Sequence, residues 1–364
     1  MAVFHAFRAL RPTPEKAADV AALPYDVVNR EEAKSIGDEN PLSFLHIDRP
    51  EMDLEPETDL YDDRVYEKAK ENLDNMEEKG ILVQDQKACY YIYELVRKGK
   101  TQTGIVGCSS IDDYMNGVVK KHELTREDKE QDRIHHVDSC NANTGPIFLA
   151  CRYPDSLLTL MNNWKDHHEA AYDFTEEDQI THRVWVIDED EVISEINKEF
   201  AGIDSLYIAD GHHRAASAVK VGLKRREQNP GYTGEEEFNY FLSVVFPYDQ
   251  LCILPYNRIV KDLNGLTVKA FLGALKFNFE LKAWPDIYEK KDVVGQLDVS
   301  ILQEKVLRPV LGIEDPRTDQ RISFVGGSHK AAELAEIADR TGGVAFVMYP
   351  TSMEDLMKIA DENK

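Results

Sequence analysis

The stretch from Ser205 to Ala218, which reads SLYIADGHHRAASA, constrains the fold more than any other part of the chain. Leu206 to Ile208 are apolar residues typical of a short buried strand, and Asp210-Gly211 is a turn signal. The alanines that follow are strong helix formers. The sequence therefore predicts a strand, a tight turn and a helix in direct succession.

The predicted turn concentrates polar side chains. The first N–H groups of a helix have no partner inside the helix, and the helix dipole is positive there, so Arg and His at this point suit a phosphate group. An aspartate at the strand end can hold Mg²⁺ or accept a proton. The alternative is that Asp210 only caps the helix and the basic residues form a solvated face. We predict Gly211, His212, His213 and Arg214 as cofactor-binding residues, and Asp210 as a catalytic residue and metal ligand.

The charge composition narrows the choice of partners. The 364 residues include 43 Lys and Arg against 67 Asp and Glu, a net charge of −24. Such a balance argues against a nucleic-acid surface and against docking to an anionic membrane, although a local basic pocket can still bind a small anion. The five cysteines are scattered without a CxxC pair, so we expect reduced thiols, and we expect a cytoplasmic protein.

A second informative stretch runs from Val118 to His136. The residues VVKKHEL indicate a strand that begins with apolar residues and ends in charged ones. Thr125 to Asp128 resemble a capping box at the start of a helix. Glu123 stands at this junction, where a carboxylate can act as a general base or hold a metal. The HExxH zinc pattern fails because Arg126 occupies the position of the second histidine.

The predicted helix is unusually polar, since Lys129, Asp132, Arg133 and His136 share one face. Such a face is either solvated or lines a polar site, and spacing alone favours solvation. The loop Asn141–Pro146 follows, rich in side chains that form hydrogen bonds, and leads into a predicted strand over 147–151.

The remaining pattern predicts an α/β protein of two domains, 1–260 and 261–364. Asn40 to Ile47 reads as a turn leading into a strand, and the runs 238–247 and 251–260 read as a hairpin. Beyond residue 261 the chain ends on an alternation of strand, helix, strand and helix.

Seven motifs in this order resemble the DUF1015 family, a domain of unknown function: FRALRP with LPYDVV, NPLSFLHIDRPE, KHELTREDKEQDR, NANTGP, ADGHHRAASA, LDVSILQE and RISFVGG. Members of that family continue into a tail rich in Pro, Lys and aromatic residues, whereas this sequence stops at Lys364. The ADGHHRA turn also resembles the nucleotide-binding turn of the ParB/sulfiredoxin-like superfamily. That resemblance implies an α/β (α+β) nucleotide-binding core with mixed sheets, followed by a smaller C-terminal α/β domain.

Within that superfamily, sulfiredoxin chemistry needs a cysteine at the turn, and none lies in 205–218. The DNA clamps need a basic helix-turn-helix, which a charge of −24 without a basic stripe disfavours. The free-serine kinases remain, and they use a glutamate that precedes the turn; this role falls on Glu123.

The resemblance to the serine kinases implies a phosphotransferase that uses Mg²⁺ and ATP or ADP to phosphorylate a small hydroxyl metabolite, free L-serine above all. The alternatives are a nucleotide-binding switch without an acceptor and a scaffold without a ligand. The expected substrate-binding residues are His122, Thr125, Lys129, Asp132, Arg133, Asn143 and Thr144.

Overall fold

The computed structural model describes residues 1–122, 125, 127–176, 179–281, 298–316, 318–327 and 329–362. They form two compact units, of which the first contains Met1–Leu251 and the residues from Met357 onward, and the second contains Cys252–Leu356. The boundary predicted between residues 260 and 261 follows strand β12 (Tyr256–Val260), whereas the contacts divide the chain ahead of that strand.

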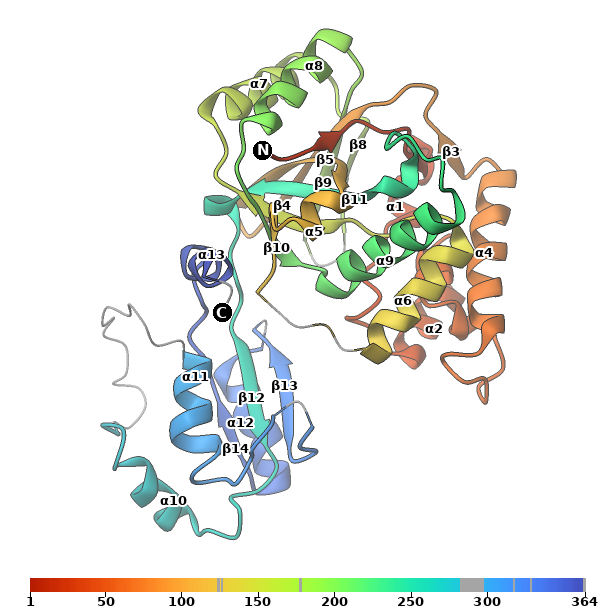
Figure 1. The fold of residues 1–364 in the computed structure, drawn as a ribbon. Helices are drawn as coiled ribbons and strands as arrows, with labels where there is room; N and C mark the ends of the chain where they lie inside the picture. The colour runs from red at the N-terminus through yellow and green to blue at the C-terminus, as the bar shows by residue number, and fades with distance from the viewer. Residues whose placement is uncertain are drawn as a thin grey trace. The chain divides into compact units, whose positions relative to one another are not determined.

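A large mixed sheet organises the first unit (Figure 1). Among the described residues it has nine strands in the order β6-β10-β7-β11-β5-β4-β9-β8, with β1 paired to β5. In chain order the strands are β1 (Phe4–His5), β4 (Tyr90–Arg97), β5 (Lys100–Ser110), β6 (Val119–Lys120), β7 (Ile147–Cys151), β8 (Tyr172–Thr175), β9 (Thr181–Ile187), β10 (Leu206–Asp210) and β11 (Tyr240–Pro247). The predicted α/β class is confirmed.

Helices pack around this sheet and against one another. They are α1 (Ala17–Val20), α2 (Arg30–Glu39), α3 (Leu45–Asp48), α4 (Asp63–Glu78), α5 (Ile111–Met115), α6 (Glu127–Cys140), α7 (Asp155–His167), α8 (Asp190–Ala201) and α9 (His212–Gln228). Helix α6 packs on α9, and α4 packs on α6, so these three helices form successive layers (Figure 1). No helix in the described ranges is long and apolar enough to cross a membrane.

Alternation along β10 explains why this strand is central. Leu206 and Ile208 point into the main core, where α9 contributes Ala215 and Val219. Tyr207 points to the opposite face and packs against residues near the C-terminus, Met357 and Ala360. Because both faces of β10 are covered, the end of the strand at Asp210 has a fixed position.

The second unit has its own sheet, in which β12 lies between β13 (Ile322–Gly326) and β14 (Val344–Phe346), antiparallel to both. Its helices are α10 (Val268–Leu275), α11 (Asp298–Leu302), the π-helical turn η5 (Gln303–Leu307) and α12 (Ala331–Thr341). Helix α13 (Met353–Asp361) begins in this unit, and its residues from Met357 onward belong to the first unit. The predicted order of strand and helix after residue 321 is confirmed. The predicted hairpin is wrong, because β11 and β12 belong to different sheets.

The strand predicted up to Ile47 is also wrong, because residues 45–48 form helix α3. Leu45 and Ile47 are both buried, as the alternation required, but they pack in separate helical clusters. Ile47 contacts the apolar face of α4 rather than a neighbouring strand. Tertiary packing therefore overrides the local strand pattern.

A histidine–carboxylate pair holds α3 to its surroundings. His46 Nδ1 lies 2.9 Å from Asp53 Oδ2, and Asn72 of α4 donates hydrogen bonds to both the His46 carbonyl and Asp53. The hydrogen bond to Asp53 raises the pKa of His46 above its ordinary 6.5, against the effect of burial. Although burial acts the other way, the same bond and the His46 charge hold the pKa of Asp53 below its ordinary 3.8.

This pair predicts a pH dependence of stability. Since the pKa of folded His46 is raised, its contribution to stability is complete below pH 6.5 and is lost as the pH rises through the pKa of the folded state. The contribution of Asp53 to stability is present above pH 3.8 and is lost as the pH falls through its lowered pKa. We expect the free energy of unfolding to fall by about 1 kcal/mol above neutral pH, and Asp53→Asn to remove this loss. Urea unfolding measured from pH 5 to about 9 tests it. Asp38→Asn, at an exposed pair with Lys34, is the control and should keep the wild-type profile.

Gly222 allows α9 to lie close to its neighbours. A Cβ at this position would lie 2.3 Å from the Phe238 carbonyl oxygen and 2.9 Å from Ile111 Cδ1. A helix interior normally gains stability from Gly→Ala, but here the close carbonyl reverses the sign.

We therefore expect Gly222→Ala to lower the free energy of unfolding by about 1–3 kcal/mol in a urea titration. Gly231 provides the control, since a Cβ at that position would have no neighbouring atom within 4 Å, and Gly231→Ala should be neutral. A stabilised Gly222→Ala variant would show that propensity dominates over the contact with Phe238.

Candidate functional site

The strand–turn–helix prediction for residues 205–218 is confirmed. Strand β10 ends at Asp210, and α9 begins at His212. Gly211 is the N-cap and has φ +90°, a left-handed conformation that favours glycine. Because the N-cap residue is this glycine, the alternative in which Asp210 serves only as the N-cap is wrong. The start of α9 is therefore suited to an anion.

Arg214 connects this turn to a distant loop. Its Nη1 donates a 2.6 Å hydrogen bond to the carbonyl of Pro146, and its Nη2 donates a 2.5 Å bond to Asp210 Oδ2. Two glycines leave room for the guanidinium, since a Cβ at Gly211 or Gly145 would lie 3.2–3.3 Å from it. The structure thus brings the loop 141–146 to the turn that the sequence singled out.

The Asp210 carboxylate is accessible, with 61% of the side chain exposed. Surrounding protein atoms raise its pKa by desolvation, Arg214 opposes this rise, and the charge of Asp26 adds to it. Asp26 is thus a second carboxylate near the turn, although the sequence analysis did not select it. Its position in the motif LPYDVV, which carries the family resemblance, was the available signal.

Two histidines meet beside the turn. The His122 and His212 rings are arranged edge to face, with centroids 4.5 Å apart. Burial lowers the pKa of both, for His212 to about 3, so His212 is neutral at physiological pH. His122 Nδ1 is buried with no hydrogen-bond partner among the described residues. A phosphate would receive at most a hydrogen bond from His212, and positive charge would come from elsewhere.

Helix α6 packs directly on α9, and Glu130 is a polar link between them on the side of the turn. The buried Glu130 carboxylate accepts a 2.7 Å bond from Thr125 and forms an ion pair with Lys220 of α9. Its backbone carbonyl accepts from Ser217 Oγ at 3.1 Å. His213 is also close enough to lower the pKa of Glu130 by its charge, which opposes the effect of burial.

The shared polar face of α6 is not generally solvated, contrary to what spacing alone favoured. Lys129 is exposed, but Arg133 is only 8% exposed and His136 only 1%. His136 Nε2 lies 2.8 Å from the Ile47 carbonyl, and burial lowers the pKa of this histidine. The α6 face is buried because α3 and α4 cover it, which the local spacing does not reveal.

Arg133 is held on several sides. Its Nε and Nη2 each lie 3.0 Å from Asp132 Oδ2, and its guanidinium lies 4.2 Å from the centre of the Tyr25 ring. Asp132 Oδ1 accepts a 3.1 Å bond from Tyr66 of α4. This network joins the segment around Tyr25 to the layers of α6 and α4.

The loop 141–146 has its own anchor. Thr144 Oγ1 donates a 2.6 Å hydrogen bond to Asp48 at the end of α3, and the Asp48 charge also acts on Arg133. Asn143 beside it is half-buried. Asp48, like Tyr25, was not selected from the sequence, but it lies in another of the resemblance motifs, NPLSFLHIDRPE.

The structure therefore gathers most of the predicted site residues around β10 and α9. Glu123, predicted as the general base, lies outside the described residues. The donor set for a metal is sparse, since the described ranges contain no group of three or more His, Cys, Asp or Glu placed to hold one. Mg²⁺ commonly takes one or two protein carboxylates and phosphate oxygens, and Asp210 fits that mode once it separates from Arg214.

Comparison with known proteins agrees with the resemblance seen in the motifs. A family model described as a protein of unknown function, DUF1015, matches residues 4–354, and the chain therefore belongs to the DUF1015 family. Neither the curated proteins nor the solved structures contain a match.

The Arg133 network predicts unequal effects of two cation substitutions on α6. Arg133→Ala leaves Asp132, whose side chain is only 11% exposed, without its charge partner and should lower the free energy of unfolding by about 3 kcal/mol. Lys129→Ala removes an exposed cation from the same helix and should change it by less than about 0.5 kcal/mol. Urea unfolding of both variants measures the difference, and equal effects would contradict a structural role for the Arg133–Asp132 pair.

Proposed function

We propose that this protein is a nucleotide-dependent kinase that phosphorylates the hydroxyl of a small metabolite, with free L-serine as the leading acceptor. The observation that carries the proposal is Arg214, which joins the glycine-capped start of α9, Asp210 and the loop 141–146. Phosphoryl transfer depends mainly on positioning and on neutralising charge, so few residues are needed.

The nucleotide phosphates would bind at the start of α9. Gly211 leaves the backbone open to a close approach, and the helix dipole and Arg214 supply positive potential. His213 and neutral His212 would add hydrogen bonds. Asp210 would then exchange its ion pair with Arg214 for Mg²⁺ bound to ATP or ADP, because a phosphate competes for the same guanidinium.

The acceptor would lie between the turn and α6. We assign the general base to Glu123, which follows His122 in the sequence, since His122 contacts His212. Lys129, Asn143 and Thr144 would bind the carboxylate and neutral groups of the substrate, with Asp132 and Arg133 as a charged pair behind them. His122 and Thr125 complete the expected substrate contacts.

The nearest alternative is a nucleotide-binding switch without a phosphoryl acceptor. The same turn would bind the nucleotide, and the ParB/sulfiredoxin-like core, inferred from the turn alone, suits either function. The number of polar groups contributed by α6 and the loop 141–146 favours a site that also holds an acceptor.

A phosphotransfer assay tests the proposal. Full-length protein is incubated with Mg²⁺, L-serine and either ATP or ADP, and products are followed by phosphorus NMR with a serine-free control. We expect O-phosphoserine only when serine is present. Arg214→Lys should lower the rate about 100-fold, because a lysine lacks the second N–H group that lets Arg214 bind phosphate while it keeps its bond to Pro146.

Arg226→Lys is the matched control, since Arg226 also lies on α9 and forms an ion pair, with Asp112, near the opposite end of that helix. Its rate should stay within about twofold of wild type. Nucleotide loss that does not depend on serine would favour the switch. An absence of turnover, together with no thermal stabilisation by either nucleotide, would reject both functions.

A further inference from the structure

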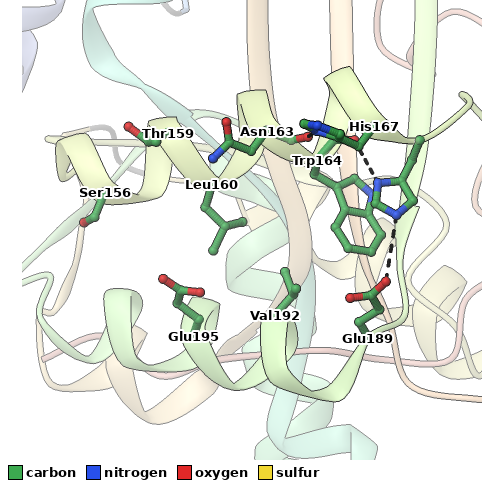
Figure 2. A pocket seen from close by; sticks show the side chains of 10 residues that line it. Ser156, Thr159, Leu160, Asn163, Trp164, His167, Glu189, Val192 and Glu195 are labelled. Atoms are coloured by element: carbon green, nitrogen blue, oxygen red, sulfur yellow. Dashed lines mark hydrogen bonds and ion pairs between the residues drawn. The ribbon is translucent and has the colours of Figure 1, made fainter.

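A groove between α7 and α8 has no part in the proposed kinase site. It encloses about 510 Å³ and is bounded by one face of each helix (Figure 2). Helix α7 contributes Ser156, Leu160, Asn163 and Trp164, among others. Helix α8 contributes Val192, which lies across the groove from Leu160. A volume in this range suits a small molecule.

The middle of the groove is apolar. Leu160 and Val192 are half-buried and face each other across it (Figure 2). The indole N–H of Trp164 donates to the Val186 carbonyl at 3.1 Å, and His168 stacks on its ring at 3.7 Å. The groups that line the centre of the groove therefore suit hydrocarbon better than a compact ion.

Carboxylates stand at the two ends of this apolar stretch. Glu189 and Glu195 lie on either side of Val192 along α8 (Figure 2). Six residues of helix correspond to about 9 Å along its axis, so one metal ion does not bridge the two carboxylates, whereas an extended chain does. His168 Nε2 lies 3.9 Å from Glu189 Oε1, and the Glu189 side chain is 56% exposed. Glu189 therefore remains accessible to a ligand.

The basic side chains among the residues that line the groove are His167 and His168, and the Nδ1 atom of each lies within hydrogen-bond distance of a main-chain carbonyl. No lysine or arginine is among the lining residues. The net charge of −24 adds a long-range attraction for cations. A ligand with positive groups at its ends and hydrocarbon between them matches this distribution.

We propose that the groove between α7 and α8 binds a linear aliphatic di- or triamine. One ammonium group pairs with Glu189 and another with Glu195, and the methylene chain between them lies over Leu160 and Val192. This site is independent of the kinase proposal, because none of its residues belongs to the Asp210–Arg214 turn.

Isothermal titration calorimetry of the full chain with spermidine and putrescine at low ionic strength tests the site. We expect Glu189→Gln and Glu195→Gln each to weaken spermidine binding about two- to fivefold, as the loss of one exposed ion pair predicts. Glu191→Gln removes the same charge from an exposed position of α8 outside the groove and should leave binding unchanged.

Two further ligands separate a shaped site from general attraction to negative charge. Butylamine has the hydrocarbon but a single charge, and Mg²⁺ has two charges but no hydrocarbon, so both should compete poorly with spermidine. Equal competition by Mg²⁺, an equal effect of Glu191→Gln, or no binding of either amine would overturn the proposal.

Discussion

The two hydrogen bonds of Arg214 are the contacts on which the candidate site depends. A mostly buried guanidinium needs acceptors for its charge, and Asp210 and the Pro146 carbonyl provide them from two different segments. Gly211 and Gly145 leave room for the guanidinium, since a Cβ at either position would lie 3.2–3.3 Å from it. Turn, helix start and loop therefore have fixed relative positions, and an anion that replaces Asp210 on Arg214 would leave the bond to Pro146 in place.

Sheet topology explains why segments so distant in sequence meet at this arginine. Strand β10 lies between β6 and β7, parallel to the first and antiparallel to the second. The described part of the chain between those two strands includes α6, which packs on α9, and the loop 141–146, which accepts a bond from Arg214. Ser217 and Lys220, which bond to Glu130, fasten that segment along the helix. The same arrangement would place an acceptor beside the phosphates.

Sequence reasoning succeeded where a local pattern determines the structure and failed where distant partners determine it. The apolar run of β10, the glycine and the alanines of α9 each favour their observed conformation locally, so the turn could be predicted. Residues 45–48 carry an alternating pattern but fold as a helix, because α4 covers them. The polar face of α6 is buried because Tyr25, Ile47 and Tyr66 contact it. These three residues are distant from α6 in the sequence, so no local pattern indicates that they meet. Tyr25, Asp26 and Asp48 were missed for the same reason.

An acidic chain can bind a nucleotide only if positive potential is local, and the buried histidines limit its source. Desolvation keeps His212 neutral, with a contribution from the nearby charges of His122 and His213, so clustering histidines at the turn does not add charge there. Among the described residues of the turn, positive potential comes from the dipole of α9 and from the guanidinium of Arg214, which is paired with Asp210. Because Mg²⁺ would compete for Asp210 and phosphate for Arg214, binding of the two together would separate the ion pair at little cost in electrostatic energy. Mg²⁺ alone would leave Arg214 without a negative partner, and phosphate alone would leave Asp210 without a positive one. At the proposed nucleotide site, this one pair would therefore favour a metal–nucleotide complex over free nucleotide or free metal.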